Sequence, residues 1–294
     1  MRNLKVTMGF RGTNYHGFQR QPNGITVQEV VETALSKLFN EPVTIQGCSR
    51  TDTGVHAKEY CFTMQTEKQL PERNFIRGAC GYLPDEKTPV VTDASEFMVR
   101  EARKHSPENP LYIVSIAAAT NAASAILTDP VAMTENVVHI WLGGHALHWV
   151  DTKEFNMKQD IAAARVLFGC GAPLVQLPCN GVASGFTTTE PELRHYLKGK
   201  NPLCDYLLAK ATEGMDRHFR DIAWDRAIWD VTAVGWLLNE KNRMMLSYLR
   251  PALIPQYDGT YSEQPTRHPM RYVYFIKRYD LMTDLFLKLA GAGQ

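Results

Sequence analysis

The chain has 294 residues and a formal net charge of +1, with 44% hydrophobic and 21% charged residues. This composition is typical of a globular protein, and the length suggests about two domains. A charge so close to zero excludes a chain whose only task is to hold nucleic acid, so any RNA binding must come from a local patch.

The N-terminal part alternates between strand and helix patterns as far as Pro84. Thr26 precedes a run of apolar residues at helical spacing, and Glu29, three residues later, completes a predicted capping box. The predicted order is strand, helix, strand, strand, helix, over residues 4–10, 26–40, 43–49, 59–66 and 71–84.

After Glu86 a linker-like stretch leads into a second series of elements. Strands and helices alternate there, which is typical of a parallel sheet with crossover helices. The predicted strands cover 109–119, 135–144, 173–181 and 271–278. The predicted helices cover 95–105, 120–130, 160–172, 192–211, 228–239 and 280–291. We therefore predict an α/β chain with two domains, 1–86 and 87–294.

Membrane insertion and export are not predicted. There is no run of about 18 apolar residues, and the first residues resemble a strand rather than a targeting segment. The six cysteines form neither a CxxC pair nor a zinc-finger spacing, which is typical of a reducing compartment. We therefore expect a cytoplasmic protein without a membrane partner.

One stretch, GCSRTDTGVHA, places a single acid, Asp52, among turn-forming residues. Arg50 is two residues away, and such a pair would keep the carboxylate ionised. An ionised and oriented aspartate can act as a nucleophile or a base. An Arg–Asp pair in a turn is also a common structural feature, so the residues alone leave both interpretations open.

The runs GTNYHGFQRQ, TVQ and SRTDTGVHA resemble the motifs of the tRNA pseudouridine synthase A family. The resemblance covers about residues 1–86 and implies an α+β, ferredoxin-like half-domain. It also implies that Asp52 is the nucleophile in uridine isomerisation, with Arg50 as its partner, tRNA as the substrate and no cofactor. The residues it implies for RNA contact are Arg11, Tyr15, Gln19, Arg20 and His56. The second half of that family's RNA cleft has no counterpart in the sequence.

From residue 87 onward the chain resembles inosine–uridine-preferring nucleoside hydrolases, through TNAA, LGG, EFN, DIAAA and WD. The resemblance implies a mostly parallel, doubly wound sheet and Ca²⁺-dependent hydrolysis of free ribonucleosides. It implies ribose binding by Glu154 and Asn156, and Ca²⁺ binding by Asp230 and the carbonyl of Thr120. The family's D-x-D-x-G-x-D-D cluster is absent from the sequence, and Trp229 stands where many members have histidine.

Three functions are therefore open. The first is isomerisation of tRNA uridine by Asp52, the second is hydrolysis of ribonucleosides by the C-terminal part, and the third is an inactive fusion of two incomplete enzymes. A nucleoside-hydrolase-like sheet without its first strand would expose an edge. We expect the synthase-like strands to cover this edge, or the protein to form a homo-oligomer.

Overall fold

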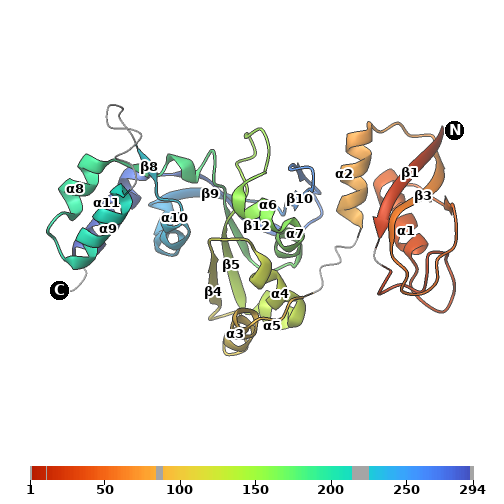
Figure 1. Ribbon diagram of the computed structural model, residues 1–294, viewed down its shortest axis with the longest axis horizontal. Coiled ribbons are helices and arrows are strands. Elements are labelled where there is room, and N and C mark those ends of the chain that lie inside the picture. The colour runs from red at the N-terminus through yellow and green to blue at the C-terminus, as the bar shows by residue number, and fades with distance from the viewer. Residues whose placement is uncertain (1, 11, 84–88, 214–224, 292–294) are drawn as a thin grey trace. The chain divides into compact units, whose positions relative to one another are not determined.

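The computed structural model describes residues 2–10, 12–83, 89–213 and 225–291. The chain forms two compact units, Met1–Lys87 and Thr88–Gln294, and Figure 1 labels their elements. No helix in the described ranges is long and apolar enough to cross a membrane.

The N-terminal unit is a three-stranded antiparallel sheet with two helices. Its elements are β1 (Arg2–Phe10), α1 (Val27–Phe39), β2 (Ile45–Gly47), β3 (Ala57–Thr66) and α2 (Glu72–Tyr82). The predicted element order is confirmed. The strand order is β1-β3-β2, so α1 connects two strands that flank β3.

Helix α1 forms where the apolar spacing predicts it. The Thr26 hydroxyl accepts a hydrogen bond from the Glu29 N–H at 3.3 Å, which satisfies a free donor of the first turn. The reciprocal bond of the predicted capping box is not formed between these two described residues. The buried face of the helix packs in one core with Tyr60 and Phe62 of β3. This core includes the stacked rings of Phe18 and Tyr60, whose centroids are 4.2 Å apart.

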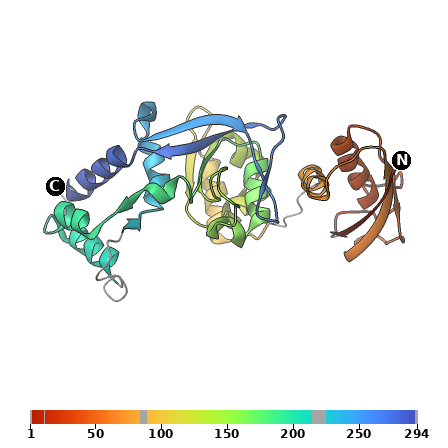
Figure 2. The same ribbon diagram turned by 90° about the horizontal axis from the view of Figure 1, so that it is seen from above.

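The C-terminal unit is built on a five-stranded mixed sheet of order β4-β5-β6-β12-β9. Its strands are β4 (Leu111–Ser115), β5 (Val137–Leu142), β6 (Leu174–Leu177), β12 (Pro269–Ile276) and β9 (Met245–Pro251). The pairs β4–β5, β5–β6 and β6–β12 are parallel, and β9 pairs antiparallel with β12. Figure 2 shows this long β9–β12 pair. The predicted mostly parallel sheet is confirmed, with one antiparallel strand added at its edge.

Helices and short strands complete this unit. The helices are α3 (Asp93–Ala102), α4 (Thr120–Thr128), α5 (Pro130–Glu135), α6 (Phe155–Gln159), α7 (Ile161–Gly169), α8 (Glu190–Leu197), α9 (Pro202–Thr212), α10 (Val231–Gly235) and α11 (Arg278–Gly291). The short strands are β7 (Thr187–Thr188), β8 (Arg226–Ala227), β10 (Ile254–Pro255) and β11 (Tyr261–Ser262). In the described residues, 3₁₀ turns cover Ala183–Gly185, Trp236–Leu238 and Glu240–Asn242.

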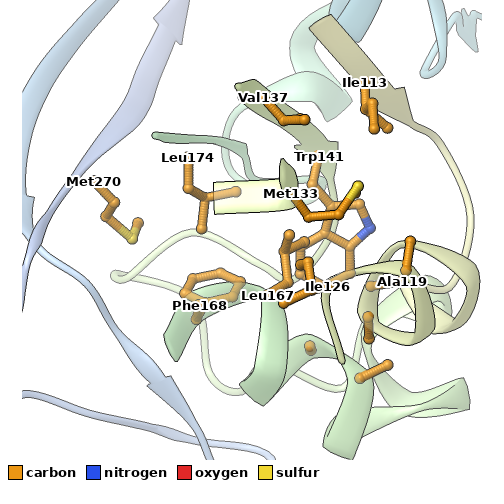
Figure 3. Close-up of a cluster of buried hydrophobic side chains, with 14 of the residues drawn as sticks. Ile113, Ala119, Ile126, Met133, Val137, Trp141, Leu167, Phe168, Leu174 and Met270 are labelled. Atoms are coloured by element: carbon orange, nitrogen blue, oxygen red, sulfur yellow. The ribbon is translucent and has the colours of Figure 1, made fainter. Parts of the chain in front are cut away.

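Two hydrophobic cores cover the opposite faces of the five-stranded sheet. Trp141 of β5 belongs to the core built with α3, α4, α5 and α7, whereas its neighbours Ile140 and Leu142 belong to the core built with α8 to α11. The alternation follows from the two-residue period of a strand. Figure 3 shows Trp141 among Met133, Ile126 and Leu167. Helices on both faces agree with the predicted doubly wound arrangement.

Two helix predictions are corrected by the structure. The helix predicted over 192–211 is two helices, α8 and α9, because Gly199 between them has a φ of +69° and Pro202 begins the second. The helix predicted over 228–239 is α10 followed by a 3₁₀ turn. Strand β9 was not predicted from the sequence.

Strand β4 forms one edge of the five-stranded sheet. It pairs with β5 on one side, and no other described strand pairs with it. The strands of the N-terminal unit form a sheet of their own and do not pair with β4 in the described residues. That the synthase-like strands cover this edge, or that the protein forms a homo-oligomer, stays a prediction.

Candidate functional site

A pocket of about 620 Å³ lies at the carboxyl ends of three parallel strands of the C-terminal unit. Open α/β sheets bind ligands at this edge, because the connections there diverge to opposite faces. Its polar side chains follow β5 and β6 or come from the segments around α6 and α10. They are His145, Lys153, Glu154, Asn156, Gln159, Asn180 and Asp230. We call this the strand-end pocket.

Glu154 is held rigidly in the pocket. It is the N-cap residue of α6, where its Oε1 accepts the N–H of Asn156 at 2.8 Å and its Oε2 accepts that of Met157 at 3.0 Å. The same Oε2 accepts the N–H of Gly144 at 3.0 Å. Gly144 has a φ of +73°, and a Cβ there would lie 2.0 Å from the Tyr261 hydroxyl, so the close approach requires glycine. Three backbone donors thus fix this carboxylate.

Asn156 presents an acceptor to the pocket. Its Nδ2 donates to the carbonyl of Leu142 at 2.9 Å and to that of Ile116 at 3.4 Å. Both amide hydrogens are therefore engaged with strand ends, and Oδ1 is the remaining polar atom. This suits a ligand that donates hydrogen bonds, such as a sugar hydroxyl.

Asp230 lines the same pocket with an unengaged carboxylate. It is the N-cap residue of α10, yet its side chain makes no capping hydrogen bond. No hydrogen bond or ion pair joins this carboxylate to another residue of the described chain. An acid at a helix start usually satisfies free N–H groups. Asp230 does not, so both of its oxygens are open to a ligand.

His145 and Cys179 are neutral at pH 7. Burial lowers the pKa of His145, although Glu154 and Asp151 oppose the shift, and its Nδ1 accepts the N–H of Asn180 at 3.3 Å. Burial raises the pKa of the Cys179 thiol, and the charge and hydrogen bond of Glu154 raise it further. A protonated thiol is a poor nucleophile, so the raised pKa disfavours thiolate chemistry here.

The predicted calcium ligands do not form a metal site. The predicted ligand atom of Thr120 is its carbonyl oxygen, but Thr120, the first residue of α4, does not line the pocket that holds Asp230. Its hydroxyl donates to Asp160 Oδ2 at 2.7 Å. Ca²⁺ takes six to eight oxygen ligands, usually with several carboxylates. Among the residues with described positions, no group of three or more His, Cys, Asp or Glu side chains could hold a metal. These residues therefore do not fit a bound Ca²⁺.

In the N-terminal unit, two glycines pack against the loop that carries Asp52. A Cβ at Gly12 would lie 2.0 Å from the Val55 carbonyl oxygen, and one at Gly17 would lie 2.4 Å from that of Thr51. The Phe18 N–H also donates to the Thr51 carbonyl at 3.1 Å. The glycine-rich motif therefore places the Asp52 loop through backbone packing.

The structure separates the other predicted RNA-site residues. Arg50 and Gln19 line a pocket of about 250 Å³, and Asp52 is exposed outside its lining. No ion pair joins Arg50 to Asp52, both of which are described, so the predicted pairing is not formed. Other predicted residues have structural partners, pack against the core, or lie outside the described ranges. These are Arg20, paired with Glu32 at 2.9 Å; His56, whose Nδ1 accepts the Gly12 N–H at 3.1 Å; Tyr15, half-buried against the core; and Arg11, outside the described residues.

Asn180 and Lys153 line the strand-end pocket but were not predicted from the sequence. Asn180 follows β6 after two residues, so the rule that sites form at the carboxyl ends of parallel strands could have identified it. Lys153 directly precedes Glu154, and no sequence motif marks it as a residue of the pocket.

The family model described as inosine-uridine preferring nucleoside hydrolase matches residues 26–272. Solved nucleoside hydrolases have a similar fold. A plant nucleoside hydrolase gives a TM-score of 0.55 at 19% identity, covering 70% of this chain and 69% of that one. A purine-preferring ribonucleoside hydrolase from Gardnerella vaginalis gives a TM-score of 0.51 at 17% identity, and the match covers 90% of this chain and 86% of that one. These likenesses establish the α/β fold with its central mixed sheet.

Curated relatives match the N-terminal part. The tRNA pseudouridine synthase A of Pelobacter propionicus is 45% identical over 86 residues, which are 29% of this chain and 35% of that protein. The enzyme of the same name from Geobacter sulfurreducens is 45% identical over 84 residues, 29% of this chain and 34% of its own. The chain thus spans about a third of the length of these relatives.

Proposed function

Because the chain belongs to the inosine-uridine preferring nucleoside hydrolase family, we propose that its C-terminal unit binds a free ribonucleoside in the strand-end pocket and hydrolyses the N-glycosidic bond. The observation that carries this proposal is the unengaged carboxylate of Asp230 in a pocket at the strand ends. The fixed Glu154 and the Asn156 acceptor lie in the same pocket, which supports recognition of a hydroxylated ring.

The residues suit the two parts of a nucleoside. Ribose hydroxyls donate hydrogen bonds, and Asp230 and the Asn156 Oδ1 accept them. Apolar side chains, including Trp229 and Leu142, line the same pocket, and the indole ring of Trp229 has a flat face on which a base could stack. Pockets of this kind combine apolar walls with a few placed polar groups.

Hydrolysis then needs one water and one proton acceptor. Water adds to C1′ of the ribose as the bond from C1′ to the base nitrogen breaks, and the bond's electron pair stays on the base. Asp230 takes a proton from the attacking water, and a proton from solvent completes the released base. The products are ribose and the free base. A positioned carboxylate of this kind acts as a general base.

The direct test uses the full chain with inosine and with uridine. We expect release of hypoxanthine or uracil, separated by chromatography, together with an equal amount of reducing sugar. Equal amounts of the two products distinguish hydrolysis from transfer of the base or sugar to another acceptor. Intact nucleosides after prolonged incubation with folded protein would contradict the hydrolase proposal.

A second candidate function rests on the N-terminal unit. The Asp52 carboxylate is exposed on a loop placed by glycine packing, next to a pocket lined by Arg50. The 45% identity to tRNA pseudouridine synthase A over 86 residues supports uridine isomerisation in tRNA, with Asp52 as the nucleophile. The base would first have to leave its stack.

Replacing Asp52 by Ala is expected to abolish any pseudouridine that the chain forms in unmodified tRNA, because the nucleophile is then missing. Mass spectrometry of tRNA digests after carbodiimide labelling measures this product. Glu59→Ala is the matched control, since Glu59 is an exposed acid on β3 of the same unit. Pseudouridine that persists in Asp52→Ala would rule out this role for Asp52.

A further inference from the structure

The strand-end pocket has too few free acidic groups for a calcium site. Of its two carboxylates, Glu154 is engaged by three backbone N–H groups, and only Asp230 is unengaged. The pocket also contains a cation, because Lys153 lies among its lining residues. Affinity for Ca²⁺ depends on the number of charged ligands. One free carboxylate in a pocket that is also lined by a lysine therefore does not fit a Ca²⁺ site.

The same groups suit a neutral, hydroxylated ligand. A ribose diol presents O–H donors, and one of the two free oxygens of a carboxylate can accept them while the other stays available to the attacking water. Such bonds are charge-assisted and are stronger than bonds between neutral groups. Acidic side chains bind ribose hydroxyls in this way in dinucleotide-binding folds.

We infer that the strand-end pocket binds its ribonucleoside without a divalent cation, and that Asp230 accepts the ribose hydroxyls directly. The inference rests on the proposed function and adds the mode of substrate binding. The aliphatic part of Lys153, a lining residue of the pocket, packs at Gly259, where a Cβ would lie 2.6 Å from its Cε.

The test is calorimetric titration of the full chain with inosine, once in EGTA and once in excess Ca²⁺, followed by titration with Ca²⁺ alone. We expect the same dissociation constant in both buffers and no heat from Ca²⁺ alone. Asp230→Asn is expected to weaken inosine binding by about 10- to 100-fold in both buffers, since a charge-assisted bond becomes a neutral one. Asp225→Asn, an exposed aspartate outside the lining residues, is the matched control and should leave binding unchanged.

The outcomes separate this inference from the proposed function. Inosine binding that appears only with Ca²⁺ would overturn metal-free binding but leave the nucleoside pocket intact. Equal binding in both buffers without loss in Asp230→Asn would overturn the role of Asp230. No binding in either buffer, by protein shown to be folded by circular dichroism, would overturn both proposals.

Discussion

Replacement of Asp230 by Asn is expected to lower kcat for nucleoside hydrolysis by about 10²- to 10⁴-fold, the usual contribution of a general base. Asparagine has the same size and retains one acceptor oxygen, but it cannot take a proton from water. The loss should therefore appear in kcat, beyond the weaker binding expected from the lost charge. Steady-state release of hypoxanthine from inosine, fitted for kcat and KM separately, measures both effects.

Asp230→Asn should not unfold the protein. Asp230 begins α10, but its carboxylate makes no capping bond there, so the helix does not depend on the negative charge. Asp225→Asn is again the control, because it removes an exposed carboxylate outside the pocket lining. An unchanged kcat in Asp230→Asn would show that another group activates the water.

Local signals in the sequence predicted most elements, whereas contacts between distant segments did not follow from them. Alternation and helical spacing placed β5, β6 and α7, because burial on a sheet or helix face imposes these periods. The break at Gly199 was missed, since the helical pattern continues on both of its sides. Strand β9 was missed because its main support is pairing with β12, which is distant in sequence.

In the candidate site, too, local motifs predicted some residues correctly, whereas contacts between distant segments were not predicted. The EFN motif identified Glu154 and Asn156, and both line the strand-end pocket. The resemblance implies Ca²⁺ binding by the Thr120 carbonyl together with Asp230, but Thr120 does not line the pocket, and its hydroxyl binds Asp160, which lies 40 residues away in sequence. No local pattern predicts such a partner. Closeness in sequence was equally misleading for Arg50 and Asp52, because an exposed ion pair gains little free energy over two hydrated charges.

Replacement of Trp141 by Ala is expected to lower the free energy of unfolding of the C-terminal unit by about 3–5 kcal/mol, as for other buried aromatic residues. The side chain is fully buried, and its ring meets that of Phe168 edge-on at 5.8 Å. Its Nε1 donates to the Ala117 carbonyl at 2.9 Å, and Ala117 lines the strand-end pocket. Trp141→Phe keeps much of the apolar contact but leaves this carbonyl without its donor, so a loss of about 1–3 kcal/mol is expected.

Urea unfolding followed by tryptophan fluorescence measures this change in the correct unit, because all five tryptophans lie between residues 141 and 236. Trp149→Ala is the matched control, since Trp149 is 45% exposed and its loss should change stability by no more than about 0.5 kcal/mol. Trp141 also connects the core to the site through Ala117. Trp141→Phe should therefore weaken inosine binding even at temperatures where the protein stays folded. Equal stability losses in Trp141→Ala and Trp149→Ala would contradict the buried packing of Trp141.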